Sequence, residues 1–488
     1  MSKNLKRLAS QVAVYGISSV VARLLNYLLV PYYTRIMSPA EYGVITDIYA
    51  LIPFALVVLS MGMESGYFRF AAKAEGAEGV RKVYASTWGI VLLVSALFFA
   101  LVALFNTPLS RAMGYEGKDY LLVAAGIITL DVAAMIPFSR LRQEGKALTY
   151  ALLKLLSVVI NIGLCILFYN AQLECFAFYD TPTDAGYALV ANLVASAATL
   201  VLLLCCNKWH SPRIDRKVLR PIVLFSLPLL VSGIAGTANE FIDRQMIKYL
   251  MPAENSLAAL GIYGAVLKIG VVMQLFTQMY RLAAEPFFLA EFKKDEFKNT
   301  TAETMKYFII LSVAIFLLIT LFGDLFALIV GPDFREGMHI LPIVLVSNAL
   351  SGVVLNLSFW YKQSGATKYA IVVTFTGLLF TVVFNIMLVP TLGYVGAALA
   401  RLVCEFAMVV VSYRLGQRHY PIPYDLKRIG EYIVVGAAIY ALSWSTSDLA
   451  PAIKYIESTL LLIGFAAYAV RRERINLGGI IKSILHRK

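Results

Sequence analysis

The chain has 488 residues, of which 59% are hydrophobic and only 15% are charged. A soluble domain of this length needs far more polar surface, so the composition excludes a soluble globular protein. A formal net charge of +13 is often a sign of nucleic-acid binding, but here the basic residues lie between apolar segments without interleaved aromatic patches. Membrane topology and anionic lipid headgroups explain these charges better, so we expect no nucleic-acid partner.

Fourteen apolar segments follow one another, each long enough to cross a bilayer. The first of them continues through Pro31 without a small-residue cleavage site, so we expect a retained span rather than a signal peptide. The sequence therefore predicts an all-α, polytopic membrane protein with 14 transmembrane helices. The predicted spans are 10–34, 43–68, 84–106, 119–140, 146–169, 186–206, 221–247, 259–284, 304–330, 338–361, 367–390, 393–415, 428–447 and 453–470.

The connections between these spans alternate in charge. One side is rich in Lys and Arg by a bias of about five to one, which the positive-inside rule assigns to the cytoplasm. The connection 170–186 contains no Lys or Arg, as expected on the outside. Both termini are predicted to be cytoplasmic. The basic clusters are Lys3/Lys6/Arg7, Arg69/Lys73/Arg81/Lys82, Arg140/Arg142/Lys146, Lys208/Arg213/Arg216/Lys217/Arg220, Lys293/Lys294/Lys298, Lys362/Lys368, Arg414/Arg418/Lys427/Arg428 and the tail from Arg471.

Two short motifs of the first half return in the second half. Met-Ser-Pro-Ala-Glu at 37–41 returns as Met-Pro-Ala-Glu at 251–254, and Arg-Gln-Glu-Gly-Lys at 142–146 returns as Lys-Gln-Ser-Gly-Ala at 362–366. Two echoes in order at one offset disfavour chance similarity between apolar segments, and a repeat of six spans implies a parallel duplication. The predicted domains are a six-helix lobe at 1–210, a second six-helix lobe at 211–420, and two extra helices with a basic tail at 421–488.

Ionisable side chains inside spans are costly and usually face a cavity or one another. Arg23 lies about 20 Å of helix rise beyond Ser10, too deep to reach either surface easily. It is either satisfied by carbonyls between packed helices or a contact for an anionic substrate. Lys268, in the eighth predicted span, is the second such cation. The candidate substrate contacts in a central cavity are Arg23, Asn26, Lys268 and Arg401.

Further charged residues are candidates for ion coupling or gating. Asp131 is either an ion or proton site or a hydrogen-bonded packing residue, and Glu64 lies between Gly62 and Gly66, whose spacing favours close helix approach. Arg401 and Glu405, one turn apart in the twelfth span, are either a structural pair or part of a site. One cluster at the end of the seventh span is either a structural clasp or gate, or a substrate contact: Glu240, Asp243 and Arg244.

The sequence lacks the common motifs for nucleotide hydrolysis and metal binding. No P-loop, His-Glu-x-x-His or Cys-x-x-Cys motif occurs, and the five cysteines lack metal-ligand spacing. The predicted outside connections are short, whereas a membrane glycosyltransferase or polymerase needs a sizeable outside domain with catalytic acids. We therefore expect a transporter rather than an enzyme, without a metal or organic cofactor.

The N-terminal third carries motifs of a known family. The run 23–43, Arg-Leu-Leu-Asn-Tyr-Leu-Leu-Val-Pro-Tyr-Tyr-Thr-Arg-Ile-Met-Ser-Pro-Ala-Glu-Tyr-Gly, resembles the opening of bacterial polysaccharide flippases of the Wzx type. The segment 62–70, Gly-Met-Glu-Ser-Gly-Tyr-Phe-Arg-Phe, is similar to the same family, and 242–247 with 261–263 looks like its second-lobe counterpart. These flippases belong to the multidrug/oligosaccharidyl-lipid/polysaccharide exporter superfamily, whose members have the MATE-like fold.

The resemblance implies a carrier that moves undecaprenyl-pyrophosphate-linked oligosaccharide from the cytoplasmic to the outer leaflet of the bacterial plasma membrane. Arg23 and Lys268 would hold the pyrophosphate, rocking of the lobes would give alternating access, and the last two helices would form a groove for the lipid tail. Lipid II flippases carry several basic residues in the cavity-facing part of the first two spans. Here only Arg23 is deep in the first, which favours an O-antigen, capsule or exopolysaccharide unit over lipid II.

Two alternatives and one choice stay open. A multidrug/cation antiporter of the same fold would favour acidic cavity residues, but the deep charges here lean basic. A membrane glycosyltransferase or polymerase is disfavoured by the short outside loops. Coupling to protons or sodium stays open, as do the polysaccharide polymerase and assembly proteins with which such a carrier would act.

Overall fold

The computed structural model describes residues 20–22, 24–171, 181–206, 212–291, 296–366, 368–446 and 450–474. Throughout these ranges the regular structure is helical, without strands. Within the part of the chain that the structure describes, twelve helical segments are long and apolar enough to cross a membrane. The protein is therefore an all-α, multi-pass membrane protein, as predicted. Residues 10–19 and 23 of the first predicted span lie outside the described residues, and α18 (Leu426–Ser445) is not among the twelve.

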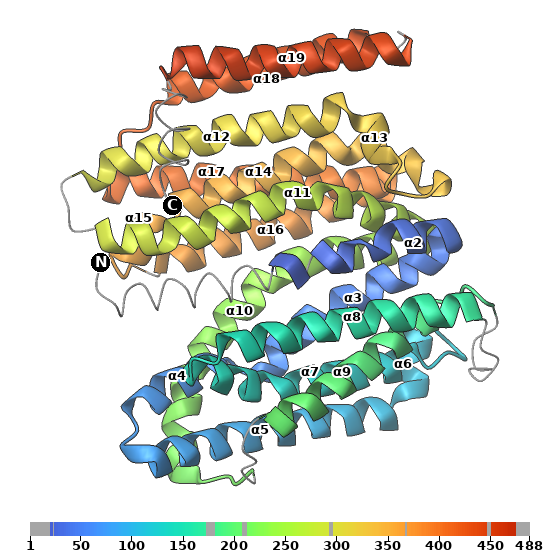
Figure 1. Ribbon diagram of the computed structural model, residues 1–488, viewed down its shortest axis with the longest axis vertical. Helices are drawn as coiled ribbons and strands as arrows, with labels where there is room; N and C mark the ends of the chain where they lie inside the picture. The colour runs from blue at the N-terminus through green and yellow to red at the C-terminus, as the bar shows by residue number, and fades with distance from the viewer. Residues whose placement is uncertain are drawn as a thin grey trace. The chain divides into compact units, whose positions relative to one another are not determined.

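The chain divides into two compact units, each described by itself. Unit 1 comprises Met1–Lys268, Val330–Phe334 and Leu378–Ala400. In Figure 1, α5, α7, α8 and α9 run side by side within it. Its helices are α2 (Leu29–Ile36), α3 (Pro39–Ser60), α4 (Met63–Lys73), α5 (Gly76–Leu104), α6 (Asn106–Ala112), α7 (Tyr120–Gln143), α8 (Ala147–Ala171), α9 (Gly186–Cys206), α10 (Arg216–Leu250), the first part of α11 (Ala253–Glu291), and parts of α16 (Lys368–Leu392) and α17 (Tyr394–His419).

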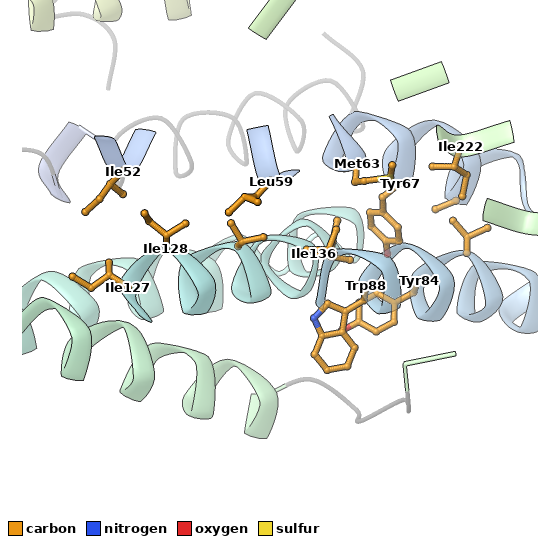
Figure 2. Packing of buried hydrophobic residues seen from close by; sticks show 14 residues of the cluster. Ile52, Leu59, Met63, Tyr67, Tyr84, Trp88, Ile127, Ile128, Ile136 and Ile222 are labelled. Carbon is orange, nitrogen blue, oxygen red and sulfur yellow. The ribbon is translucent and has the colours of Figure 1, made fainter. Parts of the chain in front are cut away.

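A large apolar cluster fills the space between α3, α4, α5, α7 and α10 (Figure 2). Tyr67 and Ile222 are fully buried in it, and Trp88 is 2% exposed. The indole N–H of Trp88 donates to the carbonyl oxygen of Ala133 at 2.9 Å, so this large side chain is buried without an unsatisfied polar group. The cluster holds together the end of unit 1 that carries its exposed basic loops, here called the basic end: Lys73, Arg81, Lys82, Arg213, Arg216, Lys217 and Arg220.

The second predicted span, 43–68, consists of two helices. Pro53 lies inside α3 without ending it; the break comes at Met61 and Gly62, both in the left-handed region with φ of 50° and 68°. A side chain on Gly62 would also approach the carbonyl oxygen of Ser226 in α10 to 2.9 Å. Gly66 lies against the same helix, so the close approach predicted for this Gly-x-x-x-Gly pair is confirmed.

At the opposite end of unit 1, the start of α3 packs against the first half of α11 with direct backbone contact. A Cβ atom added to Gly43 would overlap the carbonyl oxygen of Leu257, and one added to Gly261 would overlap that of Pro39. Only glycine allows two helices to approach so closely.

Unit 2 contains the remaining residues, Ile269–Ile329, Arg335–Gly377 and Arg401–Lys488. In it α18 and α19 (Pro451–Arg472) run side by side (Figure 1) and pack on α12. Glu473 fixes this contact, since its buried carboxylate accepts hydrogen bonds from Lys306, Arg428 and Tyr432. The remaining helices are α12 (Phe297–Leu321), α13 (Gly323–Ala327), the 3-10 helix η2 (Pro332–Ile340, partly in unit 1), α14 (Leu341–Leu357) and α15 (Phe359–Gln363).

The backbone contact between α3 and α11 predicts an asymmetric response to alanine. Gly261→Ala forces the two helices apart, and overpacking of this kind costs about 1–3 kcal/mol or more. Gly464→Ala in α19 is the matched control, because no atom lies within 4 Å of a Cβ at that position. We expect a lower thermal denaturation temperature in detergent for Gly261→Ala only; equal temperatures for the two variants would contradict the close packing.

Candidate functional site

Lys268 lies in α11 at the edge of a run of buried residues, and its own side chain is exposed. Its ammonium lies 5.4 Å from the ring centre of Tyr27, a cation–π contact. Within the described residues it makes no hydrogen bond or ion pair. The predicted partner Arg23 lies outside those residues, and Asn26, one residue before Tyr27, is exposed.

Arg244 in α10 is close enough to Lys268 for the two charges to interact. Two like charges in a span repel each other unless an anion lies between or beside them. The sequence placed Lys268 with the substrate contacts and Arg244 with the gating residues. In the structure they share one electrostatic neighbourhood, which suits an anionic group better than a cationic one.

Arg401, the fourth predicted contact, belongs to a polar network inside unit 2. Its guanidinium donates to the side-chain oxygen of Asn348 at 3.5 Å. The same oxygen accepts from Gln274 at 3.3 Å, while the Asn348 amide donates to the carbonyl oxygen of Gly270 at 3.0 Å. Asn348 is 1% exposed, so this network joins α17, α14 and α11 deep in the unit.

The predicted gating cluster in α10 is resolved only in part. The side chain of Glu240 lies outside the described residues. Asp243 is 1% exposed and accepts from the Tyr263 hydroxyl at 2.8 Å and from the backbone N–H of Arg244 at 2.8 Å. This carboxylate thus ties α10 to α11.

Asp131 and Glu64 flank a cation that the sequence analysis did not single out. Asp131 in α7 is hydrogen-bonded to Ser196 in α9, and Glu64 in α4 forms an ion pair with Arg142 at 2.5 Å. Lys154 in α8 interacts electrostatically with both carboxylates. The sequence alone could have identified Lys154 as a candidate, because it is an ionisable residue well inside the predicted span 146–169.

A second charged group missed from the sequence lies at the end of unit 1 away from the basic loops. Asp47 in α3 has no exposed surface and accepts hydrogen bonds from Tyr115 at 2.6 Å, Gln245 at 2.6 Å and Lys248 at 2.5 Å. Burial and the Asp47 carboxylate raise the pKa of Tyr115, so its hydroxyl stays protonated and keeps donating. The group ties α3 to α10 and is called the Asp47 cluster below.

Unit 2 contains an apolar groove of about 550 Å³ between α12, α14, α17 and α18. Aromatic and branched side chains from all four helices line it, among them Phe316, Leu345, Phe406 and Tyr440. Its walls are suited to hydrocarbon chains. Among the residues that the structure describes, no group of three or more His, Cys, Asp or Glu side chains could hold a metal ion.

The sequence of the chain matches the family described as "Polysaccharide biosynthesis protein" over residues 8–290, more than half its length. The chain belongs to this family. It is 20% identical over 397 residues to the probable low-salt glycan biosynthesis flippase Agl15 of Haloferax volcanii, covering 79% of this chain and 78% of the relative. Membership of a polysaccharide biosynthesis family confirms the kinship seen in the motifs.

Solved structures show the same fold. The lipid II flippase MurJ in an inward closed conformation superposes with a TM-score of 0.74 at 15% identity, over 95% of this chain and 100% of that one. An inward-facing multidrug resistance transporter of the MATE family superposes with a TM-score of 0.65 at 17% identity, over 88% and 99% of the two chains. The MATE-like fold predicted from the sequence is confirmed.

We predict that the stability of the protein depends strongly on the Asp47 carboxylate. Asp47→Asn leaves Lys248 buried without its counter-charge, a loss that costs about 3–5 kcal/mol. Asp324→Asn removes the exposed partner of Lys454 and is expected to cost less than about 1 kcal/mol. Thermal denaturation should show a large fall for Asp47→Asn alone, with partial recovery in Asp47→Asn/Lys248→Met. A double variant no more stable than Asp47→Asn would contradict the charge pairing.

Proposed function

We propose that this protein moves undecaprenyl-pyrophosphate-linked oligosaccharide units from the cytoplasmic to the outer leaflet of a bacterial plasma membrane. Its cargo is an O-antigen, capsule or exopolysaccharide unit rather than lipid II. The chain crosses the membrane fourteen times with both termini in the cytoplasm. Residues 1–210 and 211–420 form two lobes that alternate in access, and 421–488 adds two peripheral helices. Membership of a polysaccharide biosynthesis family supports a lipid-linked sugar as the cargo.

The observation that carries the proposal is the pair of neighbouring cations Lys268 and Arg244. A pyrophosphate has the charge that two adjacent cations stabilise, and charge-assisted hydrogen bonds strengthen where water is scarce. In the sequence, Arg23 and Asn26 shortly precede Tyr27, the ring against which Lys268 lies, and we assign both to the same substrate site. Arg401, inside unit 2, is a further proposed contact for the substrate. A cationic drug would meet repulsion here, which disfavours the antiporter.

The apolar groove in unit 2 supports a lipid tail. Its volume of about 550 Å³ and its lining of Phe, Leu and Tyr side chains suit a branched hydrocarbon chain. Because the tail exchanges lipid for protein and not water for protein, its burial brings no hydrophobic gain of its own. The groove therefore guides the tail more than it binds it.

The driving force is carried by carboxylates inside the spans. Asp131, Glu64, Glu240 and Asp243 are the proposed coupling or gating groups, for protons or sodium ions, with Arg244 as a further gating residue. Coupling requires that the ion change the relative stability of two conformations. A polysaccharide polymerase and assembly proteins are the proposed partners that receive the flipped unit.

Deletion of the gene tests the assignment. We expect loss of surface polysaccharide, with undecaprenyl-linked repeat units accumulating on the cytoplasmic face, measured by extracting and labelling the lipid-linked intermediates by leaflet. Chemical analysis of the accumulated lipid identifies the sugar. Normal surface polysaccharide together with increased sensitivity to cationic drugs would contradict the proposal and favour the antiporter.

Variants that remove one proposed substrate contact can be tested in the same deletion strain. Expression of Lys268→Met or Arg23→Ala is expected to restore less than about one tenth of the surface polysaccharide, because removing one charge-assisted contact costs about 1.5–3 kcal/mol. Lys82→Met is the matched control, since Lys82 is exposed and forms a surface ion pair with Glu78. Full restoration by membrane-inserted Lys268→Met and Arg23→Ala proteins would exclude these cations as substrate contacts.

A further inference from the structure

We propose that Lys154 and Arg142 form a second anion site, at the basic end of unit 1, for a phosphate or pyrophosphate group. In this site the Glu64 carboxylate occupies Arg142 until the anion arrives. The identity of the anion rests on the proposed function, whereas the site rests on the arrangement of three side chains. It is distinct from the neighbourhood of Lys268 and Arg244, because it is built from α4, α7 and α8.

Lys154 is the residue that suggests a missing ligand. It projects from α8 with its ammonium 4.3 Å from the ring centre of Phe138. No acceptor lies within hydrogen-bond or ion-pair distance of it among the residues described, although it interacts electrostatically with Asp131 and Glu64. Both carboxylates already have other partners, Ser196 and Arg142. A cation inside a span without a direct counter-ion is costly, and such residues usually mark a substrate or ion pathway.

Arg142 supplies the second cation. It lies in the last turn of α7, with its guanidinium 2.5 Å from Glu64 and 5.0 Å from the ring centre of Phe68. The side chains of Arg142 and Glu64 are 41% and 39% exposed, so the pair is open at its surface. A guanidinium binds carboxylate and phosphate with the same fork of donors. An incoming phosphate can therefore take the place of the carboxylate.

The position of Glu64 makes exchange favourable. It lies in the first turn of α4, directly after the break at Met61 and Gly62, and the positive end of that helix stabilises it when Arg142 turns to another anion. A pyrophosphate bound between Arg142 and Lys154 would supply the direct counter-charge that Lys154 lacks. Under the proposed topology the basic end faces the cytoplasm, where the lipid-linked sugar is made, so the anion meets this site before the deeper cations.

The competing account is structural: Lys154 could simply balance two carboxylates within a packed helix bundle. The two explanations predict different effects of removing the Glu64 charge on anion affinity. If Glu64 competes with the anion, removing its charge strengthens anion binding. If Lys154 only balances charge, removing Glu64 or Lys154 changes stability and leaves anion affinity alone.

The test is calorimetric titration of purified full-length protein with inorganic pyrophosphate. A Lys268→Met background weakens the first group of cations, so that the remaining binding reports the second site. In this background we expect Lys154→Met to weaken the affinity about ten-fold or more, Lys154→Arg to retain it within about three-fold, and Glu64→Gln to strengthen it several-fold. Lys82→Met serves as the unaffected control.

Two results would overturn the second site. One is an affinity of Lys268→Met/Lys154→Met within two-fold of Lys268→Met alone, and the other is a weaker affinity in Glu64→Gln. Lys154→Arg, together with the denaturation temperature of each variant, separates loss of binding from loss of folding. Because the readout is equilibrium binding, it stands whether or not the protein carries a lipid across the membrane. Failure of flipping with intact binding would count against the proposed function alone.

Discussion

The cost of keeping charge inside a membrane governs this structure more than any other constraint. An apolar chain of this composition can be packed in many ways, since lipid is as apolar as leucine. The Asp47 cluster removes much of that freedom. Its carboxylate is fully buried and needs donors from α3's neighbours, and it obtains them from Tyr115, Gln245 and Lys248. The backbone contact at Gly43 and Gly261 then brings α3 and α11 together at the same end of unit 1.

The charges in the helix bundle fall into two classes by their contacts. Asp47 and Glu473 each accept two or more hydrogen bonds, which makes them fixed parts of the helix packing. Lys268 and Lys154 instead contact an aromatic ring and interact with other charges at longer range. Charges of the first class hold a conformation, and those of the second class can receive a ligand. The proposed path of the substrate follows the second class.

The sequence predicted the fold class because hydropathy depends only on composition along the chain. It also identified Lys268 as a deep cation and the close approach at Gly62 and Gly66. It predicted one continuous span at 43–68, whereas the helix breaks at Met61. Hydropathy does not depend on backbone conformation, so it cannot reveal a residue in the left-handed region. It passed over Lys154, Asp47 and Lys248. The hydrogen-bond partners of Asp47 lie 68 to 201 residues away in the sequence, so no local pattern shows them. Contacts between residues far apart in the sequence decide whether a charged side chain stabilises the helix packing or is available to bind a ligand.

Reconstitution in liposomes tests whether the protein itself moves a pyrophosphate-linked lipid between leaflets. Purified protein in sealed liposomes would be given a fluorescent oligosaccharide linked through pyrophosphate to a polyprenol, and its exposure on each leaflet followed with a membrane-impermeant quencher. The account predicts that the protein speeds transfer between leaflets well above protein-free liposomes, and that the same tail without pyrophosphate is moved far less. Transfer at the protein-free rate, or equal transfer of the lipid lacking pyrophosphate, would contradict an anion-binding flippase.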